Sequence, residues 1–122
     1  MRVLVLADDL IWSTRLIAQV QAAGADAAPV RTLAALNQAL PAADAVIVDL
    51  TARAYDPLAA IERAASAGIH VLAVGQHDDV DLRKRALARG ADRVLAYRKL
   101  FETGPATIEA WLDRIRSKAA SV

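Results

Sequence analysis

The amino-acid sequence predicts a doubly wound α/β fold with a mostly parallel, five-stranded sheet. Short runs rich in Val, Leu and Ile alternate five times with longer segments in which apolar residues recur every three or four positions. The apolar runs are continuous, as expected of strands that are buried on both faces. Alanine is abundant and only five side chains are Phe, Trp or Tyr, so the core must be built from small aliphatic residues.

The first two βα units occupy the N-terminal third of the chain. Residues 2–7 contain the run VLVL, which predicts a buried strand, and residues 10–23 carry apolar side chains at helical spacing. Residues 27–30 predict a weaker second strand. Thr32 is suited to N-cap the second helix, and Pro41 marks the end of that helix.

Three further strands are predicted, at residues 45–50, 70–74 and 93–97. Each is followed by a helical pattern whose start carries a residue typical of helix N-termini. These residues are Asp56 with Pro57, then Asp78 or Asp79, and finally Gly104 with Pro105. The order of elements therefore repeats the βα unit up to the C-terminus.

The chain is expected to form one domain over residues 1–122. Single cores commonly contain about 100 to 150 residues, and no Pro/Gly-rich linker, low-complexity run or internal repeat divides the sequence. The first apolar run is too short for a signal peptide or a membrane span, and there is no cysteine. We expect a cytoplasmic protein that does not bind membranes.

Three aspartates follow predicted strands where such a sheet usually binds ligands. In a flavodoxin-like strand order, 2-1-3-4-5, the winding reverses between the first and third strands, and ligands bind outside their carboxyl ends. Asp8 and Asp9 follow the first strand, and Asp49 ends the third. Clustered carboxylates are usually held by a hard cation, typically Mg²⁺ or Ca²⁺, or by neighbouring cationic side chains, and we expect a Mg²⁺ site here. The alternative is that Asp9 favours a helix N-terminus and Asp49 pairs with Arg53.

Other catalytic motifs are absent from the sequence. The first turn, ADDLIWS, is not glycine-rich, and its acids would repel a pyrophosphate. No P-loop, nucleophile elbow or metalloprotease helix is found, so we expect no enzymatic activity. His77, after the fourth strand, is expected to be a solvated loop histidine.

The segments VLVLADD, VIVDL and GADRVLA resemble the receiver (CheY-like) domains of two-component response regulators. The resemblance covers nearly the whole chain. It implies that Asp8 and Asp9 are a metal-binding pair for Mg²⁺ and that Asp49 is the residue that accepts a phosphoryl group. The sequence does not identify a histidine kinase that would supply that group.

Three positions of the resemblance carry unexpected residues. The Ser or Thr expected after the fourth strand is Gly75, the lysine expected after the fifth is Tyr97, and the switching aromatic residue is Val94. Because each lost charge-assisted contact costs about 1.5 to 3 kcal/mol, phosphorylation would be slow or uncoupled from a conformational change. The resemblance therefore implies an atypical receiver, or pseudo-receiver.

Arg53 and Lys99 are candidate substitutes for the missing cation. Either side chain, by reaching the acidic pocket, would restore phosphorylation without the usual switch. The simpler interpretation is that Arg53 neutralises Asp49 permanently and that Lys99 is solvated.

Three functions remain open: a protein–protein interaction module, which the missing residues favour, a genuine Mg²⁺-dependent phosphoacceptor, and a nucleic-acid-binding domain. Nucleic-acid binding rests on seven cations between Arg83 and Lys99, opposed only by Asp92, but the net charge is +1 and no aromatic platform accompanies them.

The resemblance implies a partner-binding face on the fourth helix, fifth strand and fifth helix. Tyr97 and Trp111 are candidate anchors there, although the spacing of Trp111 fits the core better. A homodimer is a further option.

Overall fold

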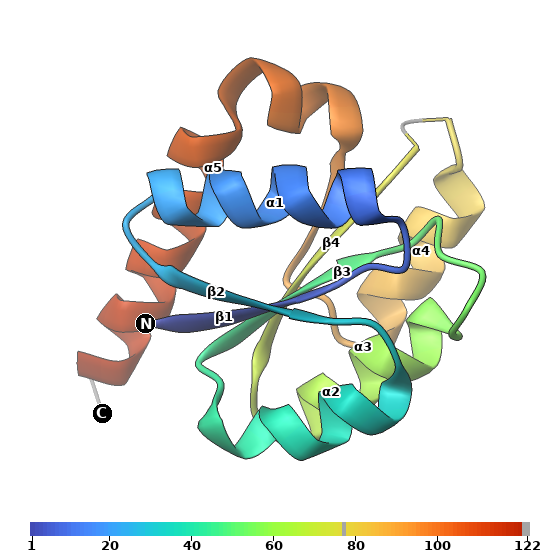
Figure 1. Cartoon of the computed structure of the whole chain (residues 1–122), viewed down its shortest axis with the longest axis horizontal. Coiled ribbons are helices and arrows are strands. Elements are labelled where there is room, and N and C mark those ends of the chain that lie inside the picture. Colours follow the sequence, from blue (N-terminus) through green and yellow to red (C-terminus); the bar gives the residue numbers. More distant parts are fainter. Residues whose placement is uncertain (77, 121–122) are drawn as a thin grey trace.

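The computed structural model describes residues 1–76 and 78–120, with side chains up to residue 118 (Figure 1). The prediction for His77 lies outside the described residues. The elements are, in order, β1 (Arg2–Leu6), α1 (Leu10–Ala22), β2 (Asp26–Val30), α2 (Leu33–Ala39), the 3₁₀ turn η1 (Leu40–Ala42), β3 (Ala45–Asp49), α3 (Pro57–Ser66), β4 (His70–Gly75), α4 (Val80–Arg89), β5 (Arg93–Ala96) and α5 (Tyr97–Ala120).

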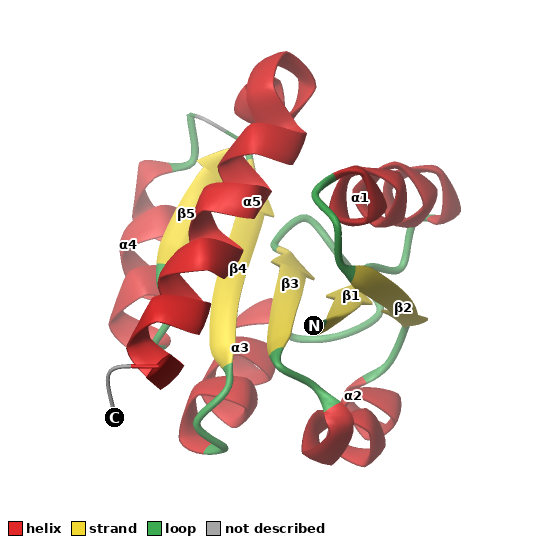
Figure 2. Ribbon diagram, turned by 90° about the vertical axis from the view of Figure 1, so that its left-hand side faces the viewer, coloured by secondary structure: helices red, strands yellow, loops and turns green. Residues whose placement is uncertain are grey.

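The five strands form one parallel sheet in the order β2-β1-β3-β4-β5. Helices α1 and α5 cover one face of this sheet, and α2, α3 and α4 cover the other (Figure 2). The predicted fold class and strand order are therefore confirmed. The winding reverses between β1 and β3, where ligands usually bind in this architecture.

Both faces of the central strands are buried. In β3, Ala45 and Ile47 pack with α1 and α5, whereas Val46 and Val48 pack on the opposite side. All four side chains are fully buried. This two-sided burial explains why the strands read as continuous apolar runs and not as alternating ones.

The predicted capping residues begin three of the helices. The Thr32 side chain accepts a hydrogen bond from the N–H of Ala35, and Asp56 and Asp79 accept equivalent bonds at the starts of α3 and α4. These bonds satisfy N–H groups that have no partner inside the helix. Short-range sequence signals therefore located these helix ends correctly.

The start of α5 differs from the prediction. Tyr97, expected to end the fifth strand, is the first residue of α5, and the backbone is non-helical only at Thr103 (φ −143°). Pro105 follows this break, as expected from its missing N–H. Helix α5 thus begins seven residues before Gly104, which changes the direction in which Tyr97 points.

Gln19 of α1 stabilises the break in α5. Its Nε2 donates to the carbonyl oxygen of Leu100 over 2.9 Å, and its side chain fills the space that a Cβ at Gly104 would need. Its Oε1 is buried, with no hydrogen-bond partner among the residues that the structure describes. Within the part of the chain that the structure describes, neither the 24-residue α5 nor a shorter helix has the length and apolarity to span a membrane.

Candidate functional site at the carboxyl ends of the strands

The predicted aspartates lie at one edge of the sheet. Asp8 follows β1 and Asp49 ends β3, and the pairing of Leu6 with Val48 brings these strand ends side by side. The structure confirms this placement. The three carboxylates nevertheless have separate partners and separate roles.

Asp49 is buried, with 1% of its surface exposed. Its Oδ1 accepts hydrogen bonds from the backbone N–H of Thr51 (2.9 Å), the Thr51 hydroxyl (2.8 Å) and the Tyr97 hydroxyl. Its Oδ2 is buried with no partner within the described residues. The carboxylate is therefore held by neutral donors through one oxygen only.

Tyr97 covers this carboxylate. The side chain is buried, and its ring packs on Trp12 with 3.9 Å between the ring centroids. Burial, and then the hydrogen bond to Asp49, raise the pKa of Tyr97 well above its ordinary value, so the phenol stays neutral and donates. The prediction that Tyr97 anchors a partner at the surface was wrong, because α5 begins at this residue and turns its side chain inward.

Further side chains extend the aromatic cover outward. Trp12 also contacts Phe101 of α5, with 5.5 Å between the ring centroids, and the Arg15 guanidinium lies over both rings. Phe101 is 57% exposed. Trp12, Arg15 and Phe101 thus extend the cover from Tyr97 toward the surface.

Tyr55 joins the two central strands beneath the aspartates. Its hydroxyl lies 2.8 Å from the carbonyl oxygens of both Leu6 and Asp49. Burial, followed by the charges of Asp49 and Asp8, raises the pKa of Tyr55 far above its ordinary value. Sequence reasoning missed this residue, since its role depends on how the loop after β3 folds back.

Asp8 organises the loop that follows β3. Its Oδ2 accepts hydrogen bonds from the backbone N–H groups of Arg53 (2.8 Å) and Ala54 (2.9 Å). These bonds hold the pKa of Asp8 below its usual range. The Arg31 guanidinium donates to the Asp8 carbonyl oxygen over 3.0 Å. Asp8 therefore links β1 to the β3–α3 loop.

Asp9 is the N-cap of α1. Its Oδ1 accepts from the backbone N–H groups of Ile11 and Trp12. This agrees with the alternative interpretation of Asp9 as a helix-capping residue. The other half of that alternative was wrong, because Arg53 contributes its backbone N–H to Asp8 and forms no ion pair with Asp49.

The described carboxylates are not gathered into a metal site. Residues 1–76 and 78–120 contain no group of three or more acidic or histidine side chains placed to hold a metal. Asp8 and Asp9 each use an oxygen to bind backbone N–H groups, and Tyr97 covers Asp49. These contacts use Oδ2 of Asp8, Oδ1 of Asp9 and Oδ1 of Asp49, so a metal shared by all three would have to bind the second oxygen of each carboxylate.

The remaining predicted positions are placed as follows. At Gly75, a Cβ would lie 3.3 Å from Leu50, which is a tight contact. Val94 is partly buried against the core on the α2–α4 face. The substitute cations Arg53 and Lys99 are both exposed, and the ion pairs of the described residues include neither.

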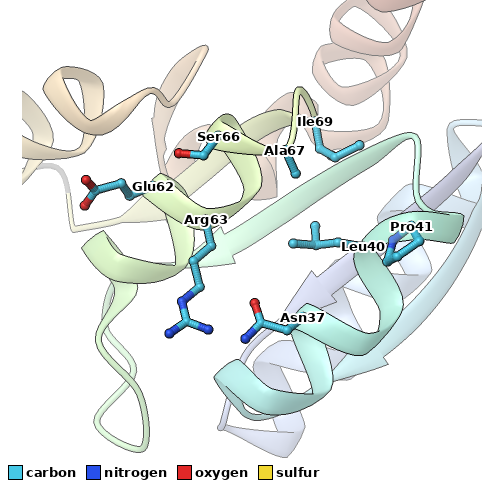
Figure 3. A pocket seen from close by; sticks show the side chains of 8 residues that line it. All are labelled: Asn37, Leu40, Pro41, Glu62, Arg63, Ser66, Ala67 and Ile69. Atoms are coloured by element: carbon cyan, nitrogen blue, oxygen red, sulfur yellow. The ribbon is translucent and has the colours of Figure 1, made fainter.

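One cavity of the described residues lies away from the aspartates. It has a volume of about 690 Å³ and lies between α2 with η1 and α3 (Figure 3). Asn37 of α2 and Arg63 of α3 point toward one another across this space, and Leu40 and Ile69 also line it. The Asp49 region therefore resembles a closed structural site more than an open binding pocket.

Solved structures with the same fold are receiver domains. The receiver domain of a putative Luxo repressor protein from Vibrio parahaemolyticus aligns with a TM-score of 0.83 and 18% identity, over 98% of this chain and 95% of that one. The receiver domain of a DNA-binding response regulator (merR) from Colwellia psychrerythraea 34H gives 0.78 and 21%, over 93% and 98%. A CheY-like receiver domain from Methanospirillum hungatei JF-1 gives 0.77 and 17%, over 96% and 97%.

No protein-family model and no curated protein matches the sequence. At 17 to 21% identity, the likeness to these structures concerns the fold. The chain therefore has the fold of response-regulator receiver domains, as the sequence resemblance predicted.

Proposed function

We propose that residues 1–122 act as a single receiver-like signalling domain in the cytoplasm, which binds a protein partner and does not use phosphorylation of Asp49 as its switch. The receiver fold supports the signalling role. The observation that carries the second part is the hydrogen bond from the Tyr97 hydroxyl to a carboxylate that is 1% exposed.

The site is poorly suited to phosphoryl transfer. The attacking oxygen must reach phosphorus in line, while cations neutralise the charge on the phosphoryl oxygens. Asp49 is buried beneath Tyr97, and the raised pKa of Tyr97 keeps that phenol neutral. A neutral hydroxyl stands where the resemblance expects an ammonium group, so attraction for a phosphodonor is lost.

The site also lacks the two side chains that the receiver resemblance expects to take part in conformational switching. Gly75 has no hydroxyl to contact a phosphoryl oxygen, and a Cβ at this position would be in tight contact with Leu50. Val94 packs against the core and has no ring to rotate. Even if Asp49 were modified, these two positions would transmit little of the change.

Mg²⁺ binding is not part of the proposal. One oxygen of Asp8 and one of Asp9 accept from backbone N–H groups, and these bonds hold the β3–α3 loop and the start of α1. The domain works as an interaction module without an enzymatic activity of its own.

The proposed partner surface consists of α4, β5 and α5. Val80 and Leu87 of α4 are 55% and 45% exposed and lie seven residues apart, on one side of the helix. Arg83 and Lys84 lie between them in the sequence, outside the ion pairs of the described chain. This combination suits a protein partner that offers apolar and acidic side chains.

Nucleic-acid binding is less well supported by the same cations. Three of the seven are engaged by acids: Arg85 with Asp81, Arg89 with Glu62 and Arg98 with Glu102. The charge left for phosphates is correspondingly smaller. A second copy of this chain is an alternative partner that size-exclusion chromatography would detect.

A second candidate function is that of a genuine phosphoacceptor with Asp49 as the acceptor. It is favoured by one observation, the unpartnered Oδ2 of Asp49 at the carboxyl edge of the sheet. A movement of Tyr97 would open this oxygen to a phosphodonor.

The deciding experiment is intact-protein mass spectrometry after incubation with acetyl phosphate and Mg²⁺, quenched in acid. Asp49→Asn serves as the matched control, and a phosphorylatable receiver domain in the same reaction as the positive control. We expect no added phosphoryl group on the wild-type chain. One added group that disappears in Asp49→Asn would establish the phosphoacceptor and refute the proposal.

A further inference from the structure

A small polar cavity lies at the opposite edge of the sheet from Asp49. Helix α5 runs beside β4 and β5 toward their amino ends (Figure 2), and there it encloses a space of about 180 Å³. Three basic side chains, Arg93, Arg114 and Lys118, line this space together with His70, Asp92 and Trp111. We call this set the basic pocket.

One side of the basic pocket is held by a hydrogen-bonded triad. Asp92 Oδ2 lies 2.8 Å from His70 Nδ1 and 3.0 Å from Trp111 Nε1. These residues come from β4, the turn before β5, and α5, and Trp111 is only 2% exposed. Because a carboxylate only accepts, His70 donates through Nδ1 and Trp111 donates through Nε1.

The charges of the pocket are unbalanced. The single acid, Asp92, is engaged by His70 and Trp111, and neither Arg93 nor Arg114 belongs to an ion pair of the described residues. By contrast, Arg116 on the same helix pairs with Asp113 over 2.9 Å. Within the part of the chain that the structure describes, the guanidinium groups of Arg93 and Arg114 therefore have no acidic partner.

We propose that the basic pocket binds a compact, doubly charged oxyanion, either a small phosphate monoester or a small dicarboxylate. Guanidinium groups match the geometry of both anions through paired N–H donors. The volume of 180 Å³ is below the range of about 300 to 1,000 Å³ that is typical for drug-sized ligands, so the ligand must be small. This binding is independent of the function proposed for the Asp49 edge.

The test is an NMR titration of the ¹⁵N-labelled full chain with inorganic phosphate, and separately with succinate, at constant ionic strength. The indole N–H of Trp111 reports on the pocket. The indole of Trp12, at the Asp49 edge, is the internal control. We expect a saturable shift of the Trp111 resonance only, and the tighter of the two anions identifies the class of ligand.

Arg93→Gln combined with Arg114→Gln should weaken this binding about tenfold or more, because each removes a charge-assisted contact. Arg116→Gln, the same change on α5 but outside the pocket, should leave the affinity unchanged. An unshifted Trp12 resonance verifies that the variants are folded. The proposal is overturned if Trp111 does not respond saturably, if chloride reproduces the shift, or if all three arginine substitutions act alike.

Discussion

The two ends of the parallel sheet each contain an aspartate that accepts a hydrogen bond from an aromatic side chain. At the carboxyl end Tyr97 donates to Asp49, and at the amino end Trp111 donates to Asp92. Asp49 is 1% exposed, whereas the Asp92 side chain is 31% exposed. An aspartate bound by an aromatic side chain is therefore closed to water at the carboxyl end of the sheet and open to it at the amino end.

The difference in partners gives these ends different roles. Asp49 has only neutral donors, and one of its oxygens is unpartnered, so its surroundings must stay fixed to hold it. Asp92 is shared with an imidazole and stands among basic side chains. The contrast teaches that the position of an aspartate at a strand end does not by itself define a ligand site. The exposure of the aspartate and the charges around it decide whether it forms a ligand site.

The largest effect is expected from truncating the cover over Asp49. Tyr97→Ala removes a buried ring that packs on Trp12, together with a donor to the carboxylate. We expect a loss of about 3 to 5 kcal/mol in the free energy of unfolding. Chemical denaturation followed by circular dichroism measures this loss. A value near zero would mean that Tyr97 does not seal the site.

A second effect should appear at alkaline pH. The pKa of both Tyr97 and Tyr55 is raised in the folded chain above the ordinary value of 10.0, chiefly by burial. Their contribution to stability is therefore complete below pH 10 and is lost as the pH rises above it, because only the unfolded state releases these protons.

Denaturation midpoints measured from neutral pH to above pH 10 test this expectation. Tyr97→Phe should show a flatter decline than the wild-type chain, since one of the two perturbed phenols is absent. Equal slopes in both proteins would show that Tyr97 ionises as freely in the folded state as in the unfolded one.

The smallest effect is expected at the open end. Asp92→Asn keeps an oxygen for the indole of Trp111 but removes the charge that faces His70. Because both side chains are about one-third exposed, we expect a loss below about 1 kcal/mol in the same denaturation assay. A loss as large as that of Tyr97→Ala would remove the distinction between the two ends.

Much of the fold was predictable because its signals are local. The apolar runs identified all five strands, and Thr32, Asp56 and Asp79 marked helix starts through bonds to neighbouring N–H groups. The gathering of Asp8 and Asp49 at one edge followed from the parallel order of strands. These features depend on spacing along the chain or on topology, which a sequence pattern carries.

The roles of individual site residues were less predictable. Moving Tyr97 from the end of a strand to the start of α5 turned an expected surface anchor into a buried cover. Asp8 binds N–H groups 45 and 46 residues away, and Tyr55 joins two strand ends. The triad of His70, Asp92 and Trp111 also depends on tertiary approach. Such contacts leave no periodic signal in the sequence.

The central claim is that the Tyr97 hydroxyl seals Asp49, and a double-mutant cycle tests it most directly. Free energies of unfolding are measured for the wild-type chain, Tyr97→Phe, Asp49→Ala and the double variant. We predict that the two changes are coupled by at least about 1 kcal/mol, the contribution of a buried hydrogen bond to a carboxylate. Additive effects, within about 0.5 kcal/mol, would contradict the seal.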